Sequence, residues 1–542
     1  MSRELGFRFD NSYARDLPGC YAPAAAAPAP APRLIAFNHA LARELGLNAA
    51  ALDSPVGAEI FSGNYAPPGS MPLAQAYAGH QFGHFVPQLG DGRALLLGEV
   101  IDLHGQRRDI QFKGSGRTPF SRGGDGKAAL GPVLREYILG EAMHALGIPT
   151  TRALAAAATG ESVYRESPLP GAVLTRVAAS HIRVGTFQFF AARGDTAKLK
   201  QLADYTIARH YPALAAEANP YLALLAAVSR RQAELIARWM LTGFIHGVMN
   251  TDNMAISGET IDYGPCAFLD TYHPATVFSS IDHHGRYAYG QQPPIARWNL
   301  TRFAETLLPL IDADPQAAIA PATAVLEEFS THYEAAWLTG MRAKLGLLAP
   351  PEPADLALAN SFLSLLETHK VDYTRAFGAL SAAARGDDAP LHALLPAPAW
   401  QTWVPAWRAR LADPAASARA MDSANPVYIP RNHLVEAALA AAVERDELAP
   451  ITARLDVLAL PFTPRPGLET YTEPAPPGSA PYRTVCGTGT RKTILIVVSP
   501  RPISPLWRTP RANGPCSTPT HRIRKELLLR MPAGLLLRCW LP

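Results

Sequence analysis

Cysteine is scarce in this chain. Five cysteines occur among 542 residues, scattered along the whole sequence at Cys20, Cys266, Cys486, Cys516 and Cys539. No pair has the spacing of metal ligands, and five cysteines cannot form an even disulfide framework. Such usage is typical of proteins in a reducing compartment. The sequence therefore argues against a zinc module and against a disulfide-stapled secreted domain.

Long hydrophobic runs are also missing. No stretch is apolar for long enough to cross a membrane, although 48% of the residues are hydrophobic. The N-terminus, MSRELGFRFDNSYARDLP, has no apolar signal core. We therefore expect a cytoplasmic protein with no membrane partner. The length allows roughly two to four domains with large cores, and no internal repeat is present.

Acidic residues are nearly absent from the last part of the chain. Residues 489–542 contain ten Lys or Arg and one acid, a formal charge of +9, which leaves −5 for residues 1–488 because the total is +4. An excess of basic residues that is confined to residues 489–542 does not indicate nucleic-acid binding by residues 1–488. We therefore expect no nucleic-acid partner. The tail has dispersed prolines and no sustained period, which predicts disorder. A frameshift product and a basic interaction tail are both open interpretations.

The most informative stretch, at residues 246–264, reads HGVMNTDNMAISGETIDYG. Asp252 and Asn253 are adjacent, and Asp262 follows after a Ser-Gly turn, a pattern that predicts a short hairpin with polar oxygens at both ends. Such oxygens are the ligands that Mg²⁺ prefers when it also binds a nucleotide's phosphates. Protein kinases hold their metal with an Asn and a later Asp in this way, but their His-Arg-Asp triplet is missing here.

Two upstream features point in the same direction. Residues 88–100, QLGDGRALLLGEV, indicate a glycine turn between two strands, where Gly90 and Gly92 would let backbone N–H groups approach a phosphate. An ordinary hairpin turn is the alternative. Lys113 ends a strand-like run, and Glu136 lies in a predicted helix, as in the lysine–glutamate pair of kinases. Taken alone, each could be an exposed surface residue, but the kinase order of all the elements makes coincidence unlikely.

Three long stretches closely resemble the selenoprotein O family, also called the YdiU family: NYAPPGSMPLAQAYAGHQFGHFVPQLGDGRA, DIQFKGSGRTPFSRGGDGKAALGPVLREYI and IHGVMNTDNMAISGETIDYGPCAFLD. The resemblance runs from about residue 8 to Thr488. It implies a kinase-like fold that lacks the usual catalytic aspartate and binds ATP in a reversed orientation. It also implies transfer of AMP from ATP, with UMP from UTP as a second expected reaction, to Ser, Thr or Tyr hydroxyls of protein substrates.

The resemblance assigns roles by motif. Lys113 and Glu136 would form the ion pair, Asp252 would be the proton acceptor, and Asn253 and Asp262 would bind Mg²⁺ or Mn²⁺. Further nucleotide contacts would be Gly90, Gly92, Arg93, Lys113, Asp125, Gly126, Arg176, Arg183 and Asp262. Guanidinium groups suit a departing pyrophosphate because they stay ionised and grip phosphate through two N–H bonds. Arg176 and Arg183 are seven residues apart, which would place them on one face of a helix.

The expected fold class is α+β, a protein-kinase-like bilobal fold with family-specific extensions at both ends. We expect the chain to be divided into four parts: an N-terminal extension with an Ala/Pro-rich segment (1–56), a strand-rich N-lobe (57–175), a helical C-lobe (176–488) and the atypical basic tail (489–542). Sequence periodicity predicts helices at 131–146, 198–218, 222–246, 316–345, 353–378 and 434–446.

The histidine pair and the cysteines are weaker candidates for functional residues. His80 and His84 have the spacing of metal ligands on a helix, but Gly83 interrupts it, so a structural role is favoured. Cys266 is best interpreted as a small buried hydrophobe. Cys486 falls near the family's C-terminal redox residue, yet the stretch that would supply a second cysteine, HPATVFSSID, has none. Two rival functions stay open: a true phosphotransferase, and an inactive nucleotide-binding scaffold.

Overall fold

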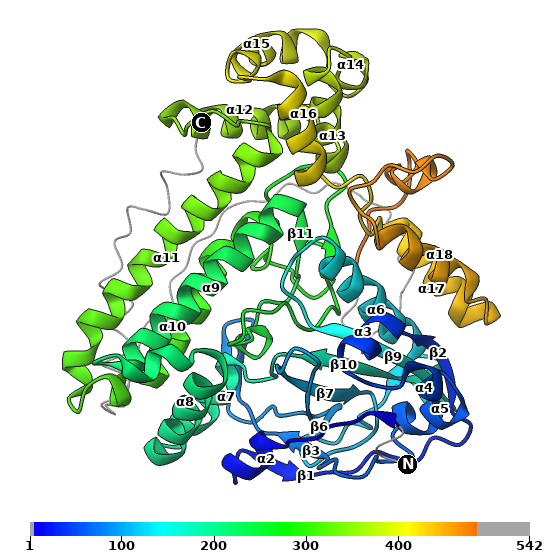
Figure 1. Ribbon diagram of the computed structural model, residues 1–542, viewed down its shortest axis with the longest axis vertical. Coiled ribbons are helices and arrows are strands. Elements are labelled where there is room, and N and C mark those ends of the chain that lie inside the picture. The colour runs from blue at the N-terminus through cyan, green and yellow to red at the C-terminus, as the bar shows by residue number, and fades with distance from the viewer. Residues whose placement is uncertain (1–4, 485–542) are drawn as a thin grey trace, which may run out of the picture.

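The computed structural model describes residues 5–484 and shows a mixed α/β protein with a large antiparallel sheet, two small two-stranded sheets and many helices (Figure 1). Within that range, eight strands form a sheet in the order β1-β3-β6-β7-β10-β9-β2, with β8 joined to β10. Their bounds are β1 (Tyr21–Pro23), β2 (Arg33–Phe37), β3 (Leu73–Gln75), β6 (Ala94–Ile101), β7 (Arg107–Lys113), β8 (Ala128–Ala129), β9 (Arg152–Tyr164) and β10 (Pro168–Ala178).

Helices cover both faces of this sheet, which is why strands β6 and β10 are apolar at most positions. Val173 of β10 packs in a core with helices α3, α4 and α5, whereas Leu174 faces α6, α17 and α18. This alternation follows from the two-residue period of a strand. The helices that cover the sheet are α3 (His39–Glu44), α4 (Ala49–Leu52), α5 (Pro55–Ser62), α6 (Leu130–Ala145), α17 (Asn432–Arg445) and α18 (Ala449–Leu458).

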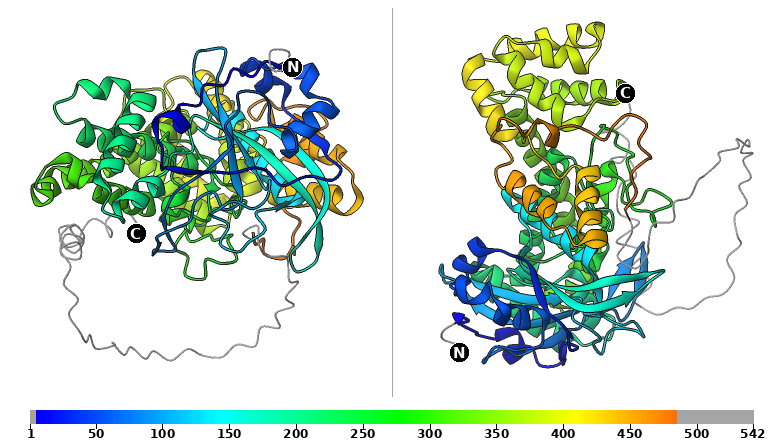
Figure 2. Two further views of the ribbon diagram at one scale, coloured as in Figure 1. Left: turned by 90° about the horizontal axis from the view of Figure 1, so that it is seen from below. Right: turned by 90° about the vertical axis from the view of Figure 1, so that its right-hand side faces the viewer.

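The other half of the molecule is helical. The long helices α9, α10 and α11 lie side by side, and α12 to α16 form the end farthest from the sheet (Figures 1 and 2). The bounds are α7 (Val184–Ala191), α8 (Thr196–His210), α9 (Pro220–Thr242), α10 (Gln292–Ile311), α11 (Pro315–Lys344), α12 (Pro353–Thr368), α13 (Tyr373–Ala384), α14 (Ala389–Leu394), α15 (Ala397–Ala409) and α16 (Pro414–Ala424). The short helix α2 (Ser12–Asp16) lies at the sheet end, beside β1 (Figure 1). No helix within residues 5–484 has the length and apolar character needed to cross a bilayer.

Three predicted helices stop earlier than the periodicity suggested. The helix predicted at 222–246 ends at Thr242, because Gly243 adopts a left-handed conformation (φ 74°) that terminates it. The one predicted at 198–218 ends at His210, since Pro212 starts a separate 3₁₀ turn. The segment 353–378 forms two helices instead of one. The predictions at 131–146, 316–345 and 434–446 match α6, α11 and α17 to within two residues.

The division into four segments stays a prediction, but the sheet extends across two of its predicted boundaries. Residues 1–56 supply β1 and β2, so the described part of this segment belongs to the sheet and does not stand apart from it. The boundary placed between residues 175 and 176 falls inside β10, which continues to Ala178. The predicted tail, 489–542, and Cys486 lie outside the described residues.

The packing between α6 and the sheet can be tested at Leu134, whose side chain is fully buried between them. Leu134→Ala removes buried methyl groups and leaves a cavity, so we expect the free energy of unfolding to fall by about 2–5 kcal/mol. Chemical denaturation followed by circular dichroism would measure this. The matched control is Leu356→Ala, at an exposed site on α12, and an equal loss in both variants would contradict the assigned packing.

Candidate active site

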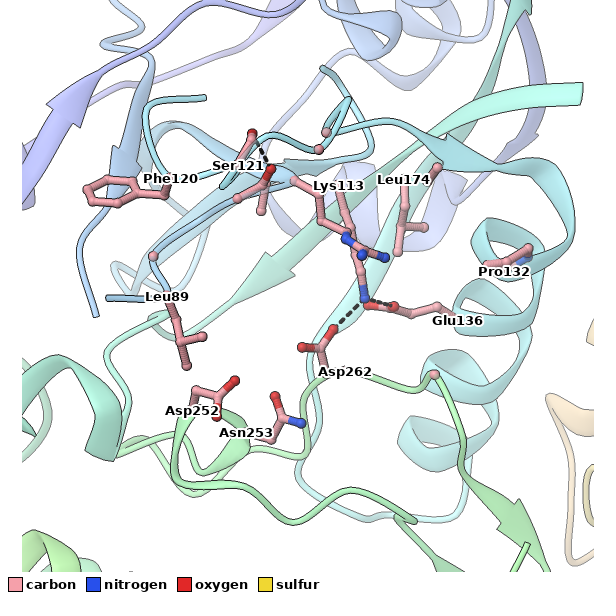
Figure 3. A pocket seen from close by; sticks show the side chains of 18 of the residues that line it. Leu89, Lys113, Phe120, Ser121, Pro132, Glu136, Leu174, Asp252, Asn253 and Asp262 are labelled. Atoms are coloured by element: carbon pink, nitrogen blue, oxygen red, sulfur yellow. Dashed lines mark hydrogen bonds and ion pairs between the residues drawn. The ribbon is translucent and has the colours of Figure 1, made fainter. Parts of the chain in front are cut away.

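One cavity of about 550 Å³ brings together every residue that the sequence predicts for the site. The sheet supplies Lys113 from the end of β7 and Arg176 from β10, while α6 supplies Glu136. Opposite them, a 3₁₀ turn at Thr251–Asn253 carries Asp252 and Asn253, and Asp262 lies on the following loop (Figure 3). Residues separated by more than 140 positions therefore face a common space, although their individual roles remain predictions.

Glu136 is the centre of a four-charge cluster. Its carboxylate accepts hydrogen bonds from Lys113 Nζ at 2.6 Å and from Arg176 Nε at 2.9 Å. Asp262 Oδ1 accepts from the same two side chains, with Arg176 Nη2 at 2.9 Å. Burial alone would raise the pKa of Glu136, but the charges of Arg176 and Lys113 outweigh it and hold that pKa below its ordinary value. The same two cations hold the pKa of Asp262 far below its usual range despite burial.

Asp252 has a different environment, with no cation on its carboxylate. Oδ1 has no hydrogen-bond partner, and Oδ2 accepts only a long bond, 3.3 Å, from Gln81 Nε2. Burial therefore raises the pKa of Asp252 to about 6, an effect that nearby Arg183 partly opposes. A carboxyl group whose pKa lies near neutrality is suited to accept a proton during catalysis.

The oxygens beside Asp252 are chemically suited to a divalent cation. Asn253 Nδ2 donates to the carbonyl oxygen of Val248 at 2.9 Å, which fixes the amide and leaves Oδ1 facing the cavity on the side of Asp262 (Figure 3). The amide oxygen of Asn253 and the carboxylate of Asp262 suit an ion such as Mg²⁺, which takes one or two protein oxygens and completes its shell with water and phosphate.

The two arginines do not share a helix face, contrary to the expectation from their spacing. Arg176 lies in β10, paired with Gln111 of β7, and Arg183 is the residue that precedes α7. Both are almost completely buried and both line the cavity. Arg183 Nη1 donates to the backbone oxygen of Asp252 at 3.0 Å, and its guanidinium lies 4.5 Å from the centre of the Tyr77 ring.

The expected hairpin at 246–264 is also corrected. Ser257 and Gly258 do form a turn, but the two arms do not pair with each other. Ala255 pairs with Arg183, and Thr260 pairs with Thr150. The polar oxygens of this segment are therefore positioned by two distant parts of the chain, which local sequence patterns could not indicate.

The glycine turn is not a hairpin between neighbouring strands. The preceding strand, β5 (His84–Val86), pairs with β4 (Gly79–Gln81) and not with β6. Gly90 has φ 65°, and a Cβ there would lie 2.3 Å from the ring of Phe120, so glycine is required. Asp91 is completely buried and accepts a hydrogen bond from the backbone of Gln75 at 3.0 Å, which argues against a solvent-exposed turn.

The second glycine corner is equally constrained. Gly126 has φ 68°, and a Cβ there would lie 1.9 Å from the backbone oxygen of Gly116. Asp125 accepts from Arg165 Nη1 at 2.7 Å, so an arginine from the β9–β10 connection holds the corner. Arg93 lines the cavity nearby.

Sequence reasoning missed several residues that line the cavity, among them Tyr77, Gln81, Arg165 and Asn250. Gln81 lies between His80 and His84, for which the sequence favours a structural role over metal binding. They lie on the paired strands β4 and β5 and not on a helix, and His80 Nδ1 shares a hydrogen bond with Gln188. Tyr77, Gln81 and Asn250 lie within the stretches that carry the family resemblance, but no spacing between polar residues there marks them as part of the cavity.

The prediction that Cys266 is a small buried residue is confirmed. Cys266 is completely buried, and burial raises the pKa of its thiol to about 12, which suits a packing residue. The last described residue, Thr484, pairs with Ser279, so the chain leading to Cys486 passes the stretch in which the second cysteine is missing.

Comparisons with known proteins identify the family. The sequence model described as protein adenylyltransferase SelO matches residues 5–458. A protein nucleotidyltransferase YdiU from Cereibacter sphaeroides is 62% identical over 487 residues, covering 89% of this chain and all of the relative. Proteins of the same name from Rhizobium rhizogenes and Chromobacterium violaceum are 59% and 60% identical, and the matches cover 89% and 87% of this chain and 97% and 100% of the relatives.

The fold and the site thus belong to a nucleotidyltransferase. More specifically, the chain belongs to the protein adenylyltransferase SelO family, because the family model covers most of it and the relatives align over nearly their whole length. The resemblance identified from three sequence stretches is confirmed.

Glu259, between the turn and Asp262, gives a test by pH. Its carboxylate accepts from the backbone of Ala179 and from Ser257 Oγ, both at 2.9 Å, and burial raises its pKa from 4.5 to about 7. The folded protein then binds the proton more tightly than the unfolded chain. The stability that this provides is complete below pH 4.5 and is lost as the pH rises through 7.

Glu259→Gln removes this titration. We therefore expect the melting temperature of the variant, relative to wild type, to be higher at pH 8 than at pH 5, as measured by differential scanning fluorimetry. Glu166→Gln, at an exposed site, is the matched control and should show no such trend. A difference between variant and wild type that is the same at both pH values would refute the role of burial.

Proposed function

We propose that this protein transfers AMP from ATP to Ser, Thr or Tyr hydroxyls of other proteins and releases pyrophosphate. Family membership supports nucleotidyl transfer to a protein. The observation that carries the proposal is the Glu136-centred charge cluster facing Asp252 across one cavity. We further propose a kinase-like bilobal division. Lys113 and Glu136 would belong to the lobe that contains the sheet, and residues 246–264, with the proposed metal ligands, would belong to the helical lobe.

The proposed chemistry follows from the charges around the cavity. Lys113, Arg176 and Arg183 would bind the phosphates, because fixed cations stabilise the negative charge that develops on departing pyrophosphate. Asn253 and Asp262 would hold Mg²⁺ or Mn²⁺, and the bound ion would neutralise further phosphate charge. Asp252 takes the proton of the acceptor hydroxyl, whose oxygen forms a bond to the α-phosphorus as the bond to pyrophosphate breaks.

A phosphotransferase is the second candidate, because the same lysine–glutamate pair and the same Asn253 and Asp262 pattern serve protein kinases. The two reactions differ in the phosphorus that is attacked. AMP transfer attacks the α-phosphorus and releases pyrophosphate, whereas phosphate transfer attacks the γ-phosphorus and releases ADP. The fate of each phosphate therefore separates them.

The test uses ATP labelled separately on the α- and γ-phosphates, incubated with purified protein, Mg²⁺ or Mn²⁺ and an extract of acceptor proteins. We expect label from the α position alone to enter protein, and Asp262→Ala to abolish it. Gel autoradiography measures the transfer. Incorporation of the γ label alone would make the protein a kinase, and ATP binding without any transfer would favour an inactive scaffold.

Lys113 allows a quantitative test of the charge cluster. Lys113→Ala removes a fixed cation from the phosphate site and leaves Glu136 with one partner fewer. We expect kcat/KM for label transfer to fall by about 10²–10³. Lys200→Ala, at an exposed ion pair on α8, should keep the wild-type rate and serves as the control. Wild-type turnover by Lys113→Ala would contradict the role assigned to this lysine.

A further inference from the structure

The β4–β5 hairpin crosses directly over the segment that carries Asp252. The backbone N–H of His80 donates to Thr251 Oγ1 at 2.7 Å, and the backbone N–H of Phe82 donates to Asn250 Oδ1 at 3.1 Å. Two anchors, one on each side of position 81, therefore fix the hairpin to the two residues that precede Asp252. Nothing in the sequence predicts this contact, because 168 or more residues separate the partners.

The side chain between these anchors contacts the proposed base. Gln81 lines the cavity, and its Nε2 donates to Asp252 Oδ2 at 3.3 Å. Gly79, two positions earlier, makes room for the same carboxylate. A Cβ at Gly79 would lie 2.8 Å from Asp252 Oδ1, closer than real Cβ atoms come. The hairpin thus contributes both the hydrogen bond to the carboxylate and the space that it occupies.

Other buried groups hold this arrangement in place. Tyr287 Oη donates to Asn250 Oδ1 at 2.7 Å, and Thr251 Oγ1 donates to Gln188 Oε1 at 2.6 Å. Gln188 in turn shares a hydrogen bond with the ring of His80 at 2.8 Å. The network fixes the backbone on both sides of Gln81 and the residues that precede Asp252, so the two side chains start from fixed positions.

We propose that Gln81 is a positioning residue for Asp252. Its amide fixes one carboxylate oxygen and keeps the group turned toward the cavity, so that the carboxylate can accept the proton of the acceptor hydroxyl. Gln81 shares no hydrogen bond with Lys113 or Arg176, which are assigned to the nucleotide. It therefore acts on the transfer step and not on ATP binding. This inference rests on the proposed function, since it assumes that Asp252 takes that proton.

Gln81→Met tests the proposal, because methionine has a similar length and lacks the N–H donor. We expect kcat for α-label transfer to fall about 10-fold, as for loss of a hydrogen bond to a charged group, while KM for ATP stays within about twofold. Gln81→Glu places a second carboxylate beside Asp252 and should lower kcat at least as much. Gln88→Met, at an exposed glutamine near the same hairpin, is the matched control and should match wild type.

ATP binding by calorimetry without acceptor gives the fraction of folded sites in each variant, and kcat is expressed per folded site. A wild-type kcat for Gln81→Met would overturn the proposal. So would a raised KM for ATP with unchanged kcat, since Gln81 would then contact the nucleotide. Absence of α-label transfer by the wild type would overturn the proposed function and this inference with it, whereas failure of the inference alone leaves wild-type transfer intact.

Discussion

The buried carboxylate of Glu136 is the constraint on which the site depends. An ionised group without partners inside a protein is very costly, so α6 can pack against the sheet only if cations meet it there. Lys113 and Arg176 do so from two neighbouring strands, and Asp262 completes the balance from the opposite side. The position of the helix, the register of β7 with β10 and the approach of the Asp262 loop are therefore fixed together.

The opposite wall depends on pairing between distant segments. Residues 250–262 contain no regular strand, and their shape is imposed by Arg183, Thr150 and the β4–β5 hairpin. Arg183 has a special place, because it pairs with Ala255 through its backbone and reaches Asp252 through its side chain. One residue thereby holds the Asp252 segment against the start of α7.

The sequence predicts those parts of the fold that have local causes. Helices such as α6 and α11 have an apolar period, and the predicted turn at Gly90 has a backbone conformation that other residues avoid. The errors arose where tertiary contacts decide. Arg176 and Arg183 have helical spacing but occupy a strand and a helix start, and the arms around Ser257 pair with other segments. The place of Gln81 beside Asp252 could not be found, because it results from a contact across the fold.

The neutrality of Gln81 follows from the chemistry required of Asp252. A cation on that carboxylate would stabilise its ionised form and lower its pKa, as Lys113 and Arg176 do for Asp262. The group would then be a weaker base. An amide can orient the carboxylate with far less effect on its proton affinity, and burial keeps the pKa of Asp252 at about 6. Arg183 donates to the backbone oxygen of Asp252 and not to its side chain, and its charge opposes the effect of burial on the pKa of Asp252 only in part. The cavity thus places Lys113 and Arg176 on Glu136 and Asp262, and only the neutral amide of Gln81 on the carboxylate of Asp252.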